Sequence, residues 1–74
     1  MTEAQRIVYG FNAESRLGRR VRYYPVAGKP EHKLSRIRSE AWLLGGHTPV
    51  VMIDGDTGCV ALANCELLAP EVPA

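Results

Sequence analysis

Residues 48–68, with the sequence TPVVMIDGDTGCVALANCELL, constrain the fold more than any other part of this chain. They contain two apolar runs, at residues 50–53 and 59–63, with the connection DGDTG between them. Apolar runs that flank a short connection rich in Gly and Asp are a strong signal for a β-hairpin. We therefore expect an antiparallel hairpin at the centre of the fold.

Both faces of this hairpin are apolar. Side chains alternate between the two faces of a strand, so Val51 and Ile53 share one face, while Val50, Met52 and Ala61 share the other. A chain of 74 residues buries only roughly 60% of the surface that its unfolded form exposes. Because so small a domain cannot easily bury both faces, we expect Val50, Met52 and Ala61 to form a self-association or partner surface.

A further strand is predicted over residues 19–26 (RRVRYYPV). Alternation would place Val21 and Tyr23 on the inner side, with Tyr24 and the intervening arginines on the outer side. Pro25 cannot donate to a ladder and therefore confines this strand to an edge or ends it. The result is a half-buried strand with a basic and aromatic outer face.

The segment at residues 33–44 (KLSRIRSEAWLL) fits two patterns. As a helix, its apolar residues fall on one stripe, and Gly45 would follow the last turn. As a strand, apolar and small residues alternate with charged residues and a tryptophan. We interpret it as a strand, because the chain then reads as strands at short regular spacing, and the helix stays open as the alternative. The strand would turn Ile37, Ser39, Ala41 and Leu43 to one face and Arg36, Arg38, Glu40 and Trp42 to the other.

The remaining segments complete a single small domain. Residues 6–11 (RIVYGF) suggest one more short strand, and residues 64–68 (NCELL) suggest a tight turn and a closing strand. We expect a core over residues 17–68, with tails at residues 1–5 and 69–74. The predicted fold class is mostly β, with five strands and room for one short helical turn.

This order of strands resembles that of the SH3-like small barrels, which are closed five-stranded sheets. The runs RVRYYPVAG, IRSEAWLLGG and PVVMIDGDTGCVALANCELL also resemble uncharacterised small proteins of phages, prophages and mobile gene cassettes. The resemblance covers residues 17–68 and contains no signature motif. It implies an SH3-like barrel and an accessory protein of a mobile element, and it carries no assigned activity.

One enzyme family has the same architecture. The plasmid-borne type II dihydrofolate reductases form a tetramer and line its pore with a Val-Gln-Ile-Tyr run and a nearby Lys. This chain has Val-Ala-Leu-Ala at residues 60–63 and no Lys after Lys33, so the groups that hold folate and nicotinamide are missing. We therefore expect a protein without catalytic residues, and a small oligomeric enzyme is only a remote alternative.

The cysteines and histidines do not indicate a metal or a disulfide. In one extended segment Cys59 and Cys65 would lie about 20 Å apart, whereas a disulfide needs Cα atoms within about 7 Å. We expect reduced thiols that pack. Together with His32 and His47 they form no CxxC or HxxxH pair, so we expect no metal and no cofactor.

The N-terminal sequence and the hydropathy pattern predict no membrane segment. No apolar run approaches the ~20 residues that span a bilayer, and residues 1–10 (MTEAQRIVYG) lack an apolar signal core. We expect a cytoplasmic protein with no membrane partner.

The net charge of +1 conceals a strong asymmetry. All nine Lys and Arg lie between Arg6 and Arg38, and residues 41–74 carry four Asp and Glu residues and no Lys or Arg. If the basic residues share one face, they could bind nucleic acid, with aromatic side chains supplying stacking surfaces. This alternative function uses Arg16, Arg19, Arg20, Arg22, Lys33, Arg36 and Arg38.

The leading functional hypothesis is a non-catalytic module that binds a protein partner or a second copy of itself, with a dimer as the expected state. Tyr, Trp and Arg are the residue types enriched at protein interfaces, and they gather in the two strands predicted at residues 19–26 and 33–44. The predicted partner-binding residues are Arg22, Tyr23, Tyr24, Arg38, Trp42 and His47.

Overall fold

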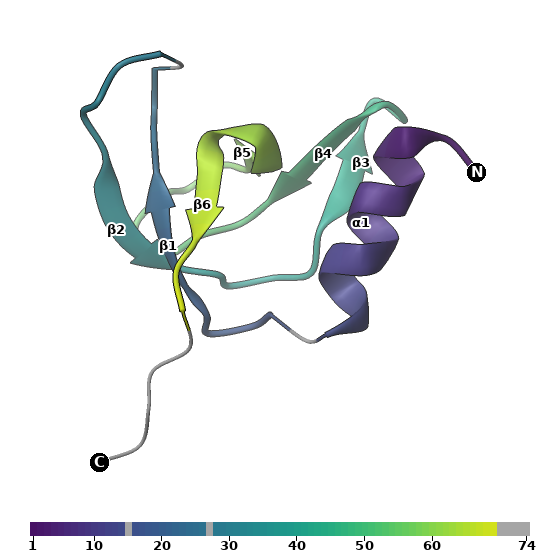
Figure 1. The fold of residues 1–74 in the computed structure, drawn as a ribbon, viewed down its shortest axis with the longest axis horizontal. Coiled ribbons are helices and arrows are strands. Elements are labelled where there is room, and N and C mark those ends of the chain that lie inside the picture. The colour runs from purple at the N-terminus through teal and green to yellow at the C-terminus, as the bar shows by residue number, and fades with distance from the viewer. Residues whose placement is uncertain (15, 27, 70–74) are drawn as a thin grey trace.

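The computed structural model describes residues 1–14, 16–26 and 28–69. The chain is mostly β, as predicted, with one α-helix at its N-terminal end (Figure 1). The elements are α1 (Glu3–Ala13), β1 (Arg20–Tyr23), β2 (Lys33–Arg36), β3 (Trp42–Leu44), β4 (Thr48–Val51), β5 (Val60–Ala61), the 3-10 turn η1 (Leu62–Asn64) and β6 (Cys65–Leu67).

The strands form two small antiparallel sheets. The first has the order β2-β1-β6, and the second has the order β3-β4-β5. A single bridge between Ile37 and Ile53 links them just beyond the ends of β2 and β4. Within the described ranges these ladders do not close on one another, so the mostly β class is confirmed and the five-stranded barrel is not.

The central hairpin is confirmed as β4 and β5. Val50 lies opposite Ala61 and Val51 lies opposite Val60, which is the pairing that the two apolar runs predict. Gly55 in the connection has a φ of +90°, a backbone conformation that residues with a Cβ rarely adopt. The turn and short strand expected after the hairpin are η1 and β6.

The strand interpretation of residues 33–44 is correct, although the strand is broken into β2 and β3. Burial alternates through the break: Ile37 and Ala41 are buried, and Arg38, Glu40 and Trp42 are exposed. The residues between β2 and β3 still bond to the residue that follows β4. Arg38 N–H donates to the Met52 carbonyl, and the Ser39 hydroxyl accepts from Met52 N–H. Period-two alternation therefore predicts the faces correctly even where the ladder is interrupted.

The strand predicted at residues 6–11 is wrong, because these residues belong to α1. Thr2 and Gln5 form a capping box at the start of the helix: Gln5 N–H donates to Thr2 Oγ1, and Thr2 N–H donates to Gln5 Oε1. This reciprocal pair satisfies two backbone donors that a helix start leaves free. Part of the predicted tail at residues 1–5 is accordingly helical. Residues 70–74 of the other predicted tail lie outside the described residues.

The core lies between the two sheets. Its buried cluster consists of five aliphatic side chains, and Phe11 of α1 packs against it together with Tyr23 of β1. The helix also contacts β3 and β4, beside which it runs in Figure 1. The inward orientation predicted for Val21 and Tyr23 is thus confirmed. The buried cluster is Val21, Ile37, Val51, Ile53 and Val60.

Candidate functional site

The outer side of the first sheet carries three arginines. Val21 is fully buried in the core, so its neighbours Arg20 and Arg22 point to the outer side. Arg20 lies directly opposite Arg36, and Arg22 lies opposite Leu34, and residues opposite one another in a ladder share a face. We name Arg20, Arg22, Leu34 and Arg36 the basic face.

A shallow depression of about 200 Å³ lies on this face, lined by Arg20, Leu34, Arg36 and Leu68 together with Ser35. Leu34 is 69% exposed there. The depression shows that guanidinium groups and apolar side chains from β2, β1 and the end of β6 border one surface.

Arg22, a member of the basic face, also belongs to a small polar cluster with Glu66 and Tyr24. Its guanidinium pairs with Glu66 at 2.7 Å, and interaction with Tyr24, followed by that with Glu66, raises the pKa of Arg22. Tyr24 in turn contacts His32, with ring centroids 5.4 Å apart. The Tyr24 and His32 rings therefore lie just beyond the end of β1, next to Arg22.

Several arginines of the predicted nucleic-acid set bond to the chain itself, among them Arg36, whose guanidinium donates to the Gly18 carbonyl. Arg16 pairs with Glu14 and lies over the ring of Phe11, and Arg19 Nε donates to the Leu68 carbonyl at 2.8 Å. Arg38 donates to the carbonyls of Ile53 and Asp56, which begin and end the turn after β4. The guanidinium groups of Arg16, Arg19 and Arg38 thus contact the residue that follows α1, the residue that follows β6 and the turn that follows β4, respectively.

Lys33 is set apart from the basic face by its register. It lies opposite Tyr23 on the inner side of the first sheet, where its ammonium group pairs with Asp56 and stands over the Tyr23 ring. The seven basic residues predicted from sequence thus do not form one surface. Arg20, Arg22 and Arg36 are the ones that the sheet places together.

The outer side of the second sheet is apolar. Val51 and Val60 point into the core, so the row opposite them, formed by Trp42, Val50 and Ala61, points outward. Val50 is only 3% exposed, whereas Trp42 is 38% exposed. Leu44, two residues beyond Trp42 on the same face, is 50% exposed. We name Trp42, Leu44, Val50, Met52 and Ala61 the apolar face.

The predicted partner-binding residues are divided between the two sheets. Arg22 and Tyr24 belong with the first sheet, Trp42 belongs to the second, and His47 lies in the turn between β3 and β4. Tyr23 packs against the core, which leaves only part of its surface for contact. The structure instead joins Trp42 to Val50 and Ala61, two of the residues predicted for self-association.

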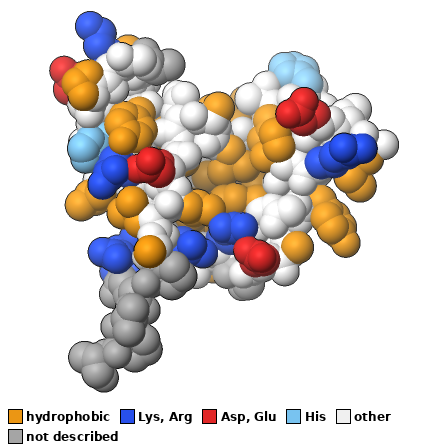
Figure 2. Space-filling view, in the orientation of Figure 1, with side chains coloured by type: hydrophobic (Ala, Val, Ile, Leu, Met, Phe, Trp, Pro, Cys, Tyr) orange, Lys and Arg blue, Asp and Glu red, His pale blue; other side chains and the backbone are white. Residues whose placement is uncertain are grey.

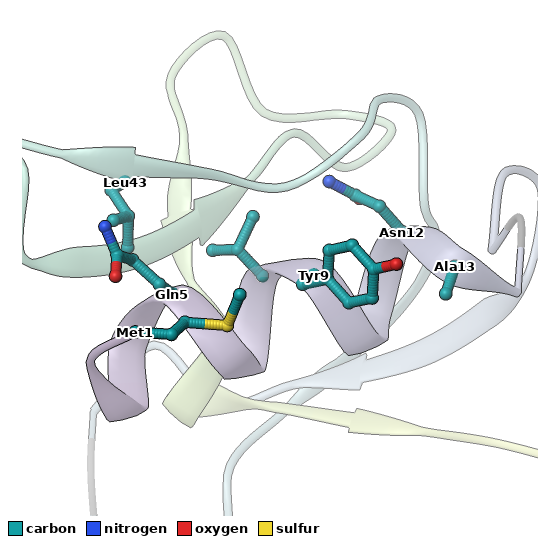
Figure 3. A pocket seen from close by; sticks show the side chains of 7 residues that line it. Met1, Gln5, Tyr9, Asn12, Ala13 and Leu43 are labelled. Carbon is teal, nitrogen blue, oxygen red and sulfur yellow. The ribbon is translucent and has the colours of Figure 1, made fainter.

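Sequence reasoning missed two hollows because it missed α1. An open groove of about 760 Å³ runs between α1 and β3, where Gln5 lies beside Leu43 and Tyr9 lies nearer to Asn12 (Figure 3). A second hollow, of about 280 Å³, lies between α1 and the η1–β6 segment and includes Phe11 and Cys65. Figure 2 shows apolar side chains in a hollow at the middle of the molecule. The sequence signal that could have revealed both is the capping box at Thr2.

The Cys65 thiol at the second hollow is not a poised nucleophile. Cys59 and Cys65 are free and half-buried, and burial raises the pKa of the Cys65 thiol. A raised pKa keeps the thiol protonated, whereas a reactive cysteine needs the thiolate. Among the described residues no three His, Cys, Asp or Glu side chains gather as a metal site. No helix there is long and apolar enough to cross a membrane.

The comparisons with known proteins found no significant match to this chain. No protein-family model matches the chain, and neither the curated proteins nor the solved structures contain a significant match.

Proposed function

We propose that this chain is a non-catalytic interaction module that self-associates through the apolar face, with a second copy of the chain as its partner. The observation that carries the proposal is the exposure of Trp42 and Leu44 on the sheet face that also carries Val50 and Ala61. Large apolar side chains that gather on an exposed sheet face are typical of association surfaces. Tryptophan is also among the residues that contribute most to binding at interfaces.

The chemistry of the apolar face favours a copy of itself over a charged partner. Its five residues include no ionisable side chain. A two-fold dimer places the same patch on both sides of the interface, and an uncharged apolar patch can meet itself without burying a charge. Val50 is already buried by its neighbours, so Trp42, Leu44 and Met52 would supply the contact surface.

The size of the core supports the same proposal. Five aliphatic side chains form the buried cluster, and domains of this length commonly depend on a disulfide, a metal or a partner subunit. A dimer would add the burial of Trp42 and Leu44. At about 25 cal/mol per Å² of apolar surface removed from water, burying a fully exposed large side chain contributes about 2 kcal/mol, and the part of Trp42 and Leu44 that is still exposed would contribute the corresponding fraction.

We also propose that the fold is a partly open SH3-like arrangement. β1 pairs with both β2 and the last strand β6, β4 lies between β3 and β5, and a 3-10 turn precedes β6. This order agrees with the resemblance noted in the sequence. The further proposal that the protein is an accessory factor of a mobile element rests on that sequence resemblance.

A pair of leucine variants tests self-association. Leu44→Glu places a charge on the apolar face, and Leu34→Glu places the same charge on the basic face, at a leucine that is more exposed. We expect Leu44→Glu to weaken dimerisation by at least about 2 kcal/mol, or about thirtyfold in Kd, because the interface would bury the carboxylate. Sedimentation equilibrium measures this, and Leu34→Glu should leave the dimer intact.

Two controls make the comparison decisive. Circular dichroism and the urea midpoint establish that both variants fold, and Trp42, the only tryptophan, reports by its emission whether the apolar face is covered. The proposal is wrong if Leu44→Glu and the unmodified chain have the same association constant, or if Leu34→Glu alone disrupts the dimer.

A further inference from the structure

The core of the molecule is incompletely covered between α1 and the η1–β6 segment. Several partly buried apolar side chains pack against the buried cluster, and four of them line the hollow of about 280 Å³ at this place. Figure 2 shows basic side chains beside the apolar hollow at the middle of the molecule. Pockets that hold small molecules have mostly apolar walls and a few polar groups that fix the orientation of the ligand. The four apolar side chains are Phe11, Leu62, Cys65 and Leu67.

Arg16 is the charged side chain at this hollow, and its donors are incompletely used. A guanidinium group has five N–H donors. One terminal nitrogen of Arg16 donates to Glu14 at 2.8 Å, and Nε is buried with no acceptor in the part of the chain that the structure describes. The Glu14 side chain is 71% exposed, and an ion pair open to water contributes little. Arg16 therefore retains donors for a further acceptor in the hollow that it lines.

We propose that this hollow binds a small carboxylate with an apolar tail. The carboxylate would accept from the terminal nitrogens of Arg16, and the tail would cover Phe11 and Leu67. Carboxylate oxygens match the planar fork of a guanidinium and accept charge-assisted hydrogen bonds from it. At about 30 Å³ for each water-sized group, the hollow of about 280 Å³ holds about nine non-hydrogen atoms. Octanoate, a linear fatty-acid anion, has about this size.

The neighbouring hollows fit this ligand less well. A hollow of about 120 Å³ also includes Phe11 and Arg16, but Glu40 lines it as well, and its carboxylate would repel an anion. The groove between α1 and β3 is larger, but its described lining contains no Lys, Arg or His side chain. The proposal is independent of self-association, because no residue of the apolar face is among the described residues that line this hollow.

Cys65 gives a direct readout of whether the hollow is occupied. Its thiol is free and lines the hollow, so a bound tail would shield it from a small maleimide. Cys59→Ser leaves Cys65 as the only thiol. We expect octanoate to slow the labelling of this variant by about tenfold at about nine times its Kd, because labelling proceeds only from the unoccupied fraction. Titration calorimetry of the unmodified chain with octanoate should give the same Kd.

Three ligands with the same tail test the role of the charge. We expect octanoate to bind about tenfold more tightly than octanol, because the carboxylate accepts charge-assisted hydrogen bonds. Octylammonium should bind most weakly, since its charge repels Arg16. These comparisons use the unmodified chain, so their outcome needs no variant to fold.

Two glutamine variants locate the carboxylate. Arg16→Gln should reduce the affinity for octanoate to that for octanol, a loss of about tenfold. Glu14→Gln should increase the affinity for octanoate, because it removes the carboxylate that competes for the same guanidinium. Arg6→Gln is the matched control, since it removes the same charge from an exposed position of α1 that does not line the hollow.

Several results would overturn the proposal. One is the absence of octanoate binding and of Cys65 protection in chains that carry Arg16. Another is equal affinity for octanol and octanoate, which would make the hollow a purely apolar site. A loss in Arg6→Gln equal to that in Arg16→Gln would reduce the effect to net charge. Protection of Cys65 that grows with protein concentration in the absence of ligand would show that a second copy of the chain covers the hollow.

Discussion

Arg20 and Arg38 are both exposed arginines, and the fold uses their guanidinium groups differently. Arg20 belongs to the outward row of the basic face. Arg38 donates from Nε to the Ile53 carbonyl and from a terminal nitrogen to the Asp56 carbonyl at 2.8 Å, so it clamps both ends of the turn that follows β4. Residue type alone could not distinguish the two roles, because each depends on which backbone atoms the fold brings within reach.

Removal of the Arg38 clamp should destabilise the fold. We expect Arg38→Ala and Arg38→Lys each to lower the free energy of unfolding by about 1 kcal/mol, since hydrogen bonds from a charged donor to the backbone are lost and an ammonium group cannot reproduce the planar fork. Urea unfolding measures the loss, with Arg6→Ala as the control. An unchanged midpoint in Arg38→Lys would show that charge, and not the two directed hydrogen bonds, is what matters at this position.

At the scale of elements, α1 is the feature that most changes the interpretation of the chain. Residues 6–11 include β-branched and aromatic side chains, which favour a strand locally. The capping box at Thr2 and Gln5 and the packing of Phe11 against the core outweigh that preference. The helix also bonds to the chain before β3, because the Asn12 amide donates to the Ala41 carbonyl and accepts from Ala41 N–H. The helix is therefore held by the apolar packing of Phe11 against the core and by the hydrogen bonds of Asn12 to the Ala41 backbone.

The capping box gives a direct test of whether α1 belongs to the cooperative domain. Thr2→Ala removes the side-chain acceptor for Gln5 N–H, and we expect a loss of about 1 kcal/mol in the free energy of unfolding. Thr2→Ser keeps the acceptor and should retain most of the stability. If Thr2→Ala has no effect in urea unfolding followed by circular dichroism, then the first residues behave as the tail that the sequence suggests.

At the scale of the whole molecule, the sequence predicts which way side chains point and which strands form the central hairpin, but not which distant strands meet. Alternation correctly places Val21 inward and Trp42 outward, because the period of a strand is local. Whether Arg22 and Trp42 share a surface depends on non-local pairing, and the register places them in different sheets. The predicted partner set is therefore dispersed: Arg22 lies on the basic face and Trp42 on the apolar face, while Tyr23 packs against the core.

The absolute mass of the chain in solution tests the central claim most directly. Light scattering behind a sizing column, at low and at moderate salt, should give twice the chain mass of 8.1 kDa, with little dependence on salt because the apolar face carries no ionisable group. A mass of one chain at every concentration that the column can resolve would contradict the account. The exposed Trp42 and Leu44 would then need a partner other than a second copy.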